Sequence, residues 1–344
     1  MKRFVRAGII GLGRIGFSLG LDRLREQPAS HARALAENPA IRLDGGCDPD
    51  AHRREEFLRR YPRARTYAHA GEMLTDLEWD ILVIATPEDS HLPVFREVAA
   101  AKPRLVILEK PVAPNLEAAL EIERLAKEFA VPVLVNHERR FSRDWLNIRD
   151  LASSGGLGEL LLMSGSVLTR GAAWYAGDET RARGALLHDA THMADCLAFV
   201  AGAALTVENA VHTGKDAKGN VKGFSFSGHA GEAVYHMNAG YGGRAFVFEA
   251  EFLFREGRLR IGNGVFSLER VRKSPFYEGF HSLVPAPSVR PFRRTGYFSG
   301  MVQAALDFLD GRAPLRSGLS DGIAALRVLE EAAMIAGIFP EAKG

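Results

Sequence analysis

The chain has 344 residues, 47% of them hydrophobic and 25% charged, and its formal net charge is +2. This length and composition are typical of a globular protein with two domains, each able to bury its own core. The small net charge argues against nucleic acid as a partner, and the lack of any run of about 18 apolar residues argues against a membrane-spanning protein. We therefore expect neither nucleic acid nor membrane among its partners.

The cysteine content is low. Cys47 and Cys196 are far apart in the sequence and match no spacing that is typical of a metal site. Free thiols are usual in the reducing cytosol, whereas small secreted proteins use cysteines in disulfide frameworks. The sequence therefore predicts a cytoplasmic protein without structural disulfides.

The first predicted strand, Phe4 to Ile10, runs directly into the sequence GLGRIG, and a helix is expected to follow. In this context G-x-G-x-x-G is typical of a dinucleotide-binding turn. Gly11 permits the tight turn, Gly13 lets the backbone approach a pyrophosphate, and Gly16 lets helix and strand pack closely. The helix N-terminus then offers N–H groups to the phosphates. The predicted cofactor-binding residues here are Gly11, Gly13, Arg14, Ile15 and Gly16.

The second predicted strand, Ile41 to Cys47, ends at Asp48. An acid in this position accepts hydrogen bonds from the adenosine ribose hydroxyls and repels a 2′-phosphate, which favours NAD over NADP. Arg53 and Arg54 follow closely and are suited to a phosphate, so NADP stays open; both residues are equally typical of a solvated helix.

The spacing between the glycine motif and Asp48 is unusual. Asp48 lies 32 residues after Gly16, where about 20 is usual. The excess lies in FSLGLDRLREQPAS, before helix resumes in SHARALAENP. This segment predicts either a longer first helix or an inserted turn that ends at Pro28.

Strands and helices continue to alternate through the first part of the chain. Strands are predicted at Asp80 to Ala85, at Leu105 to Leu108 and in VPVLVN, and helices in LPVFREVAAA and at Leu116 to Phe129. This alternation indicates a doubly wound parallel sheet of the Rossmann type, whose ligands bind at the carboxyl ends of the strands. Four polar residues fall at such ends: Asp48, Thr86, Lys110 and Asn136.

The segment GALLHDATHMAD places His188, His192 and Asp195 at i, i+4 and i+7, which is one face of a helix. Two histidines at this spacing are able to bind a metal ion. However, Asp195 lies about 10.5 Å along the helix axis from His188, and no other His/Cys cluster is near in the sequence. We therefore predict no metal site.

Several of these pieces together resemble the glucose–fructose oxidoreductase and inositol dehydrogenase family (Gfo/Idh/MocA). The matching pieces are GLGRIG, ATPEDSH, EKPVAPNLEAA, NHERRFSRDW and GALLHDATHMAD, in the family's order. The resemblance runs from Ala7 to about Leu197, and more faintly from Ser317 to Ala333. It implies a dinucleotide-binding Rossmann domain, expected at residues 1–138, and an α/β domain for substrate binding and oligomerisation, expected at 139–344.

The second domain is expected to carry a large, mostly antiparallel open sheet, as the resemblance implies. The sequence agrees, because LLLMSGSVLT, FSFSGHA, AVYHMNAGYG, RAFVFEAEFLF and RLRIGNG have the pattern of strands separated by glycine turns. Such a sheet often builds the oligomer interface in this family, which implies a homodimer or homotetramer.

The resemblance also implies an activity, the NAD(P)-dependent oxidation of a secondary alcohol, or the reverse reduction, on a sugar, amino sugar or cyclitol. Two alternatives stay open. The family includes NAD-dependent glycosidases, which oxidise, eliminate, add water and reduce again. A nucleotide-sensing binding protein without catalysis is the other alternative.

Individual residues match the family's catalytic positions. Lys110 matches the lysine that contacts the reacting hydroxyl, where an amine steadies negative charge as hydride leaves. His192 matches the general acid/base, and its unperturbed pKa suits proton exchange near neutrality. Asp195 matches an aspartate that contacts the substrate or fixes the histidine.

One position departs from the family. An aspartate usually lies four residues before the catalytic histidine, and here that residue is His188, with Asp189 one place later. Either His188 replaces the aspartate as a hydrogen-bond partner or proton relay, or a helix distortion brings Asp189 into use, or catalysis is lost. The first is favoured, so His188 joins Lys110 and His192 as a predicted catalytic residue.

The remaining predicted contacts follow from the resemblance and from residue chemistry. Arg140 is suited to hydrogen bonds with sugar hydroxyls, although pairing with Glu138 or Asp144 is an alternative. Trp174 and Tyr175 are suited to stack on a sugar face, with core or lid packing as the alternative. Further cofactor contacts are expected from Thr86, Pro87, His91, Glu109, Lys110, Asn136 and Arg139. The expected substrate contacts are Lys110, Arg140, Trp174, Tyr175, His188, His192 and Asp195.

Overall fold

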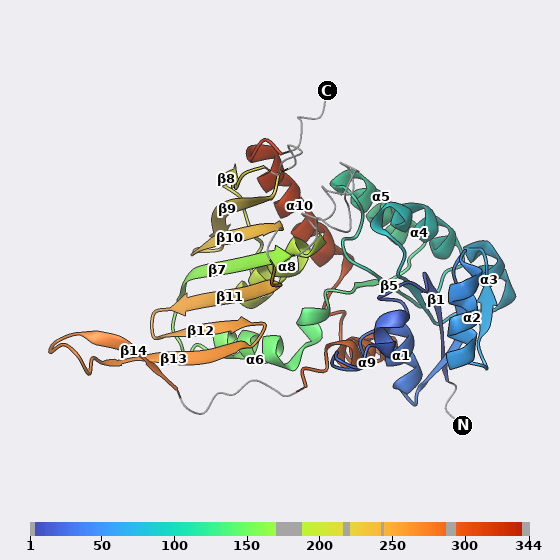
Figure 1. Ribbon diagram of the computed structural model, residues 1–344, viewed down its shortest axis with the longest axis horizontal. Coiled ribbons are helices and arrows are strands. Elements are labelled where there is room, and N and C mark those ends of the chain that lie inside the picture. Colours follow the sequence, from blue (N-terminus) through green and yellow to red (C-terminus); the bar gives the residue numbers. More distant parts are fainter. Residues whose placement is uncertain (1–3, 170–187, 216–220, 242–243, 287–293, 339–344) are drawn as a thin grey trace. The chain divides into compact units, whose positions relative to one another are not determined.

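The computed structural model describes residues 4–169, 188–215, 221–241, 244–286 and 294–338 (Figure 1). The chain divides into two units. The first contains Met1–Ser142 and Gly296–Ile323, and the second contains Arg143–Thr295 and Ala324–Gly344. No helix among the described residues is long and apolar enough to cross a membrane.

The first unit is built on a six-stranded sheet of order β3-β2-β1-β4-β5-β6, in which every pairing is parallel. Its strands are β1 (Val5–Ile10), β2 (Ile41–Cys47), β3 (Arg65–Tyr67), β4 (Ile81–Ile84), β5 (Leu105–Leu108) and β6 (Val133–Val135). The sequences ILVI of β4 and LVIL of β5 are buried throughout, as expected for strands covered on both faces. The predicted doubly wound parallel sheet is confirmed, with its switch in strand order between β1 and β4.

The helices of the first unit follow the predicted alternation. They are α1 (His31–Glu37), α2 (Ala51–Arg60), α3 (Ala70–Asp76), α4 (His91–Ala100), α5 (Leu116–Glu128) and α9 (Tyr297–Leu309), with 3-10 turns η1 (Ser18–Leu21), η2 (Glu88–Ser90) and η3 (Glu138–Phe141). Helix α5 illustrates why these helices form. The side chain of Asn115 caps its first turn by accepting a hydrogen bond from the backbone N–H of Ala118. Its buried residues recur at helical spacing, at Ala119, Ile122 and Leu125.

The glycine motif is followed by an insertion and not by a regular helix. Residues 17–30 contain only the short turn η1, and α1 begins at His31. Yet the N–H groups of His31 and Ala32 donate to the carbonyls of Ile15 (3.0 Å) and Gly16 (2.9 Å). The backbone hydrogen bonding therefore continues from the glycine turn into helix α1, and residues 17–30 form a loop inserted between them. Of the two predicted alternatives, the inserted turn is confirmed and the longer first helix is wrong.

The division into units differs from the predicted domain boundaries. The first break follows Ser142, close to the predicted boundary at 138/139, but residues 296–323 return to the first unit. The physical reason is burial: Phe298, Met301 and Val302 of α9 lie in the same apolar core as β1, β4 and β5. The sequence analysis placed this segment in the second domain, because an apolar helix face does not reveal which core it covers.

The second unit is built on a sheet whose eight described strands have the order β14-β13-β12-β11-β7-β10-β9-β8. Only the β7–β10 pairing is parallel among them, so the predicted mostly antiparallel sheet is confirmed. The strands are β7 (Leu160–Thr169), β8 (Asn209–His212), β9 (Gly223–Ala230), β10 (Ala233–Tyr241), β11 (Val247–Phe254), β12 (Gly257–Gly262), β13 (Val265–Lys273) and β14 (His281–Pro285). The helices are α6 (Arg143–Ser153), α8 (Ala190–Ala201) and α10 (Leu319–Ile335), of which α10 belongs to this unit from residue 324.

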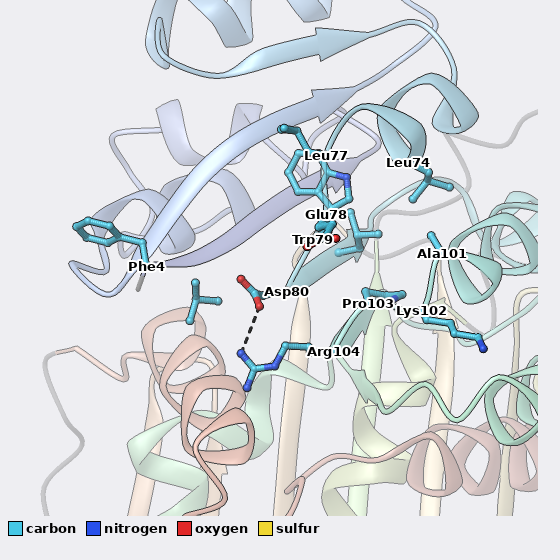
Figure 2. A pocket seen from close by; sticks show the side chains of 12 residues that line it. Phe4, Leu74, Leu77, Glu78, Trp79, Asp80, Ala101, Lys102, Pro103 and Arg104 are labelled. Carbon is cyan, nitrogen blue, oxygen red and sulfur yellow. Dashed lines mark hydrogen bonds and ion pairs between the residues drawn. The ribbon is translucent and has the colours of Figure 1, made fainter. Parts of the chain in front are cut away.

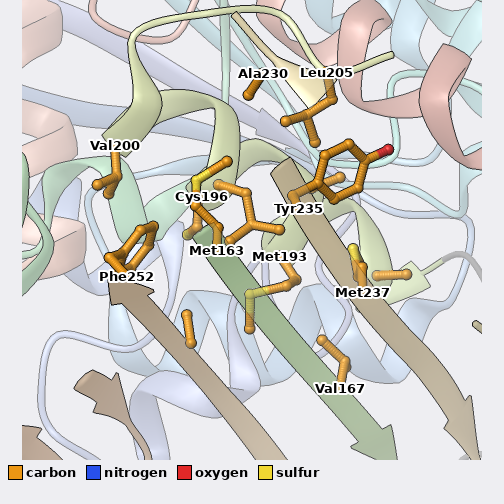
Figure 3. Packing of buried hydrophobic residues seen from close by; sticks show 14 of the residues in the cluster. Met163, Val167, Met193, Cys196, Val200, Leu205, Ala230, Tyr235, Met237 and Phe252 are labelled. Atoms are coloured by element: carbon orange, nitrogen blue, oxygen red, sulfur yellow. The ribbon is translucent and has the colours of Figure 1, made fainter. Parts of the chain in front are cut away.

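Helix α8 packs closely on one face of this sheet (Figure 3). Met193 and Cys196 of α8 lie over Met163 and Val167 of β7 in the buried cluster. The closest approach is at Gly165 of β7, where a Cβ atom would lie 2.7 Å from Cγ of Met193. A glycine is therefore required at this position for α8 to lie against the sheet.

Replacing Gly165 with valine is expected to push α8 away from the sheet, because an added Cβ would already lie 2.7 Å from Cγ of Met193 and 3.3 Å from Cδ1 of Leu197. We expect a loss of about 1–3 kcal/mol in the free energy of unfolding, measured by urea denaturation. Gly71→Ala is the control, because the nearest atom to that added Cβ is Glu97 Oε2 at 3.7 Å. Equal stability of Gly165→Val and wild type would contradict the close approach.

Candidate active site

The glycine turn after β1 is shaped by its own packing and leaves one face open. Gly11 has φ +100°, and a Cβ there would lie 2.5 Å from the carbonyl oxygen of Ala85. A Cβ on Gly16 would collide with the carbonyl oxygen of Gly11. At Gly13 the only atom near an added Cβ is Nη1 of Arg53, at 4.0 Å. Gly13 thus keeps the turn open toward a ligand, which fits a backbone cradle for a pyrophosphate.

Asp48, directly after β2, is held against this turn. Its side chain is 3% exposed, and its Oδ2 accepts a hydrogen bond from the N–H of Leu12 (2.9 Å). Nη1 of Arg53 lies 3.4 Å from the same oxygen. Arg54 donates instead to the backbone carbonyls of Asp48 (2.7 Å) and Pro49 (2.9 Å). Of the two arginines, Arg53 is therefore the cation beside the carboxylate.

A chain of buried polar groups lies at the carboxyl ends of β5 and β6. Oε1 of Glu109 accepts hydrogen bonds from Nε2 of His31 and Nδ2 of Asn136, both at 2.6 Å. Oε2 of Glu109 accepts from the backbone N–H of Lys110 (3.3 Å). Burial opposes ionisation of Glu109, but the hydrogen bonds from His31 and Asn136 and the charge of Lys110 outweigh it and lower the pKa of Glu109 to about 2. The site therefore contains a buried carboxylate that is ionised at neutral pH.

His31 was missed by the sequence analysis, although its side chain is fully buried in this chain of groups. It lies 78 residues from its partner Glu109, and only the fold brings them together. A histidine at the first position of a short helix gives no local signal of such a contact.

The loop after β4 is joined to the segment after β5 by His91, the first residue of α4. Its Nε2 lies 3.0 Å from the carbonyl oxygen of Thr86, and its Nδ1 lies 3.1 Å from that of Val112. Burial lowers the pKa of His91, against the effect of the two carbonyls. Both ring nitrogens thus face protein, so His91 supports the loop that carries Thr86 and Pro87 and has no nitrogen turned to a cofactor.

Two buried oxygens at these strand ends have no partner among the described residues: Oγ1 of Thr86 and Oδ1 of Asn136. Buried polar atoms in native proteins are nearly always hydrogen-bonded. Unsatisfied acceptors of this kind fit a site completed by a ligand that carries hydroxyl or amide donors. Lys110 lies between them in the strand order, partly exposed after β5.

The two arginines of η3, Arg139 and Arg140, differ in burial. Arg140, a predicted substrate contact, is 7% exposed, and its Nη1 donates to the carbonyl of Arg316 (2.9 Å) and pairs with Asp321 (3.1 Å). Its guanidinium therefore contacts the returning segment of the first unit, and its role as a substrate contact stays a prediction. Arg139, the predicted cofactor contact, lies in the same turn and is partly exposed.

In the second unit, α8 carries His192 and Asp195, which are 7% and 2% exposed. They lie three positions apart and share a helix face. Helix α8 begins at Ala190, and Asp189 before it is a turn residue whose φ and ψ (−93° and −21°) are still right-handed helical, while half-buried His188 is itself helical. The carbonyl of His188 accepts from Oγ1 of Thr191 (3.1 Å). The predicted helix through residues 188–195 is thus interrupted by a turn at Asp189.

Two further predictions concern this part of the chain. Trp174 and Tyr175 lie outside the described residues. Within the described ranges, no three His, Cys, Asp or Glu side chains form a group that suits a metal ion.

A cavity of about 610 Å³ lies at the other edge of the first sheet, at the amino ends of β1, β4 and β5 (Figure 2). Two of the polar groups that line it, Asp80 and Trp79, are paired with protein. Asp80 accepts from the backbone N–H of Arg6 (2.8 Å) and from Arg104 (3.3 Å), and Nε1 of Trp79 donates to the carbonyl of Met73 (3.0 Å). In parallel sheets ligands bind at the opposite, carboxyl ends, so this cavity is separate from the candidate site.

Residues 5–137 match the sequence model of an oxidoreductase family with an NAD-binding Rossmann fold, Gfo/Idh/MocA. This part of the chain is therefore similar to the NAD-binding domain of the Gfo/Idh/MocA oxidoreductases. The inositol 2-dehydrogenase of Corynebacterium glutamicum is 31% identical over 168 residues, which cover 48% of this chain and 46% of that protein. The chain thus matches about half the length of this curated relative.

Solved structures of dehydrogenases share the fold over nearly the whole chain. The myo-inositol 2-dehydrogenase of Lactobacillus plantarum has a TM-score of 0.77 at 20% identity, covering 98% of both chains. The WlbA dehydrogenase of Bordetella pertussis, solved with NADH and UDP-GlcNAcA, has a TM-score of 0.77 at 19% identity, covering 97% of both. Residues 5–137 of the first unit therefore have an NAD-binding Rossmann fold, and the unpaired oxygens of Thr86 and Asn136 fit that assignment.

Replacing Glu109 with glutamine tests the buried carboxylate. The pKa of Glu109 in the fold, about 2, lies below that of an exposed glutamate, about 4.3. Its ionised form therefore stabilises the fold above about pH 4.3, and this contribution is lost as the pH falls toward 2. We expect Glu109→Gln to lower the free energy of unfolding by about 1–3 kcal/mol at pH 7 and by less at pH 3.

Urea denaturation at both pH values measures this difference. Glu55→Gln, on the exposed surface of α2, is the control and is expected to change little at either pH. The same loss for Glu109→Gln at pH 7 and at pH 3 would argue that Glu109 is not ionised in the fold.

Proposed function

We propose that the protein is an NAD(P)-dependent oxidoreductase that transfers a hydride between nicotinamide and a secondary alcohol or ketone of a sugar, amino sugar or cyclitol. The observation that carries the proposal is the carboxyl edge of the first sheet. There Lys110 follows an ionised, buried Glu109 and lies between two unpaired acceptors. The inositol 2-dehydrogenase relative and the dehydrogenase solved with UDP-GlcNAcA support this substrate class.

NAD is the proposed cofactor, with NADP as the alternative. The carboxylate of Asp48 is fixed by Leu12 at the end of β2, where it suits ribose hydroxyls. Arg53 beside it is 51% exposed at the side chain, so its guanidinium is free to turn toward a 2′-phosphate. Binding of both dinucleotides therefore has to be measured.

The proposed chemistry divides between cofactor and protein. When bound, NAD supplies the acceptor for the hydride from the alcohol carbon. The ammonium group of Lys110 donates a hydrogen bond to the alcohol oxygen and stabilises the negative charge that develops there. His192 takes the hydroxyl proton, and in the reverse direction it returns the proton to the carbonyl oxygen. Asp195 orients the histidine or the substrate.

A second candidate function is nucleotide binding without catalysis. It is favoured by His188, which takes the place of the family's aspartate and lies before the N-terminus of α8. The presence of Lys110 and His192 favours catalysis. Activity measurements decide between the two.

The decisive experiment follows NADH and NADPH absorbance across a panel of sugars, UDP-sugars and cyclitols, with wild type beside His192→Ala and His188→Asp. We expect turnover of one substrate class by wild type and a fall of about 10²–10⁴ in kcat for His192→Ala, the usual contribution of a general acid/base. His188→Asp, which restores the family's residue, is expected to retain activity.

Tight NADH binding with no turnover of any compound in the panel would move the binding-protein function to first place. Full activity of His192→Ala would remove the proposed role of that residue. Calorimetric titration of NADH and NADPH with wild type separates these outcomes from a failure to bind cofactor.

We propose that the open face of the second sheet pairs with a second copy of the chain. Leu162 of β7 lies directly beside Val234 of β10 and Leu253 of β11 on this face. Leu162 and Val234 are 42% and 43% exposed. Contiguous exposed apolar side chains on a sheet are typical of an interface, which supports a homodimer or homotetramer.

Light scattering tests the oligomer. Leu162→Glu places a charge in the middle of the apolar patch and is expected to shift the mass toward the monomer. Leu24→Glu is the control, because Leu24 is 97% exposed in the first unit. A monomeric wild type at micromolar concentration would contradict the proposal.

We also propose the cytoplasm as the compartment. Both cysteines, Cys47 and Cys196, are buried and form no disulfide. Burial, with the neighbouring charge of Asp48, raises the pKa of Cys47 to about 12, so this thiol is inert at neutral pH. Two buried thiols that form no disulfide support a reducing environment.

A further inference from the structure

The hydrogen bonds around Glu109 have a fixed direction. An ionised carboxylate only accepts hydrogen bonds. Nε2 of His31 and Nδ2 of Asn136, each 2.6 Å from Oε1, must therefore both carry the hydrogens that they donate. The tautomer of His31 and the orientation of the Asn136 amide follow from this one charge.

The orientation of the Asn136 amide makes its side-chain oxygen, Oδ1, available to accept a hydrogen bond from a ligand. Because the NH2 group faces Glu109, Oδ1 is turned away from it, and this oxygen is buried with no partner in the described parts of the chain. The side chain as a whole is 1% exposed. A buried acceptor of this kind needs a donor, and hydroxyl and carboxamide groups are the donors that a dinucleotide carries.

The sheet topology indicates which half of the dinucleotide is involved. Asp48 follows β2 and Asn136 follows β6, on opposite sides of the switch between β1 and β4. A dinucleotide in such a sheet spans the switch point, with the adenosine half on the side of the second strand. The donor that meets Oδ1 of Asn136 therefore belongs to the nicotinamide half.

The backbone of His31 is hydrogen-bonded to the glycine turn, which links its side chain to the cofactor site. Its N–H donates to the carbonyl of Ile15 in the glycine turn (3.0 Å), while its ring donates to Glu109 (2.6 Å). The ring is 0% exposed and packs edge-to-face on Phe298 at 5.1 Å. One rigid residue thus connects the turn that receives the pyrophosphate with the group that orients Asn136.

We propose that His31 is a positioning residue of the cofactor site, which fixes Glu109 so that Asn136 presents Oδ1 as an acceptor to the nicotinamide half of the bound dinucleotide. The inference rests on the proposed function only in that NAD(P) is the ligand. It does not depend on which alcohol is oxidised.

Calorimetric titration with NADH and with ADP tests the proposal. ADP carries the adenosine half alone and serves as a control ligand. His31→Leu removes the donor and keeps an apolar side chain beside Phe298. We expect it to weaken NADH binding about tenfold, the effect of one lost hydrogen bond to a charged group, and to leave ADP binding within about twofold of wild type.

Two further variants separate positioning from a structural effect. His31→Gln has an amide N–H in place of the ring Nε2–H, and we expect it to restore NADH affinity to within about threefold of wild type. In an Asn136→Ala background the effect of His31→Leu on NADH should largely vanish, because the group through which it acts is gone.

Three results with these variants would overturn the inference. Equal losses of NADH and ADP affinity in His31→Leu indicate general damage to the fold, and additive effects of His31→Leu and Asn136→Ala indicate independent roles. Unchanged NADH binding in His31→Leu shows that the contact is irrelevant to the cofactor. A wild type that binds neither NADH nor NADPH overturns the proposed function as well, whereas one that binds NADH without oxidising any alcohol leaves this inference standing.

Discussion

A buried carboxylate must be matched by donors, and the carboxyl edge of the first sheet is organised around the one at Glu109. Three separate segments supply the donors: the helix after the glycine turn, the residue that follows β6 and the backbone that follows β5. Removing a charge of this kind from water is costly unless it is fully hydrogen-bonded. These hydrogen bonds therefore fix the positions of Lys110, Asn136 and the glycine turn relative to one another. A cofactor site requires such fixed positions of its contact residues.

The sequence was sufficient for those parts of the structure that are specified locally. The alternating elements, the glycine turn and the polar residues at strand ends predict the parallel sheet, because each follows from the pattern of a short segment. The positions of Asp48 and Asn136 were predicted on this basis. The mostly antiparallel second sheet was implied by the family resemblance and agreed with the spacing of its glycine turns.

What the sequence did not show depends on contacts between distant segments. His31 and Glu109 are 78 residues apart, and Arg140 reaches the carbonyl of Arg316. The return of α9 to the first core is of the same kind, since an apolar stripe fits any core. Such pairings are set by tertiary packing and leave no periodic signal in either partner.

The two ends of the inserted loop at residues 17–30 lie close together, because the backbone of α1 is hydrogen-bonded to the glycine turn. Glu26 anchors its later part to the backbone N–H of Gly296 (2.6 Å), while Leu24 projects fully into solvent. A loop with adjacent ends adds little closure entropy when it is lengthened. The tip around Leu24 is therefore a suitable attachment point for a fluorophore or a short reporter peptide on the dinucleotide-binding domain. An insertion there leaves the glycine turn and α1 intact.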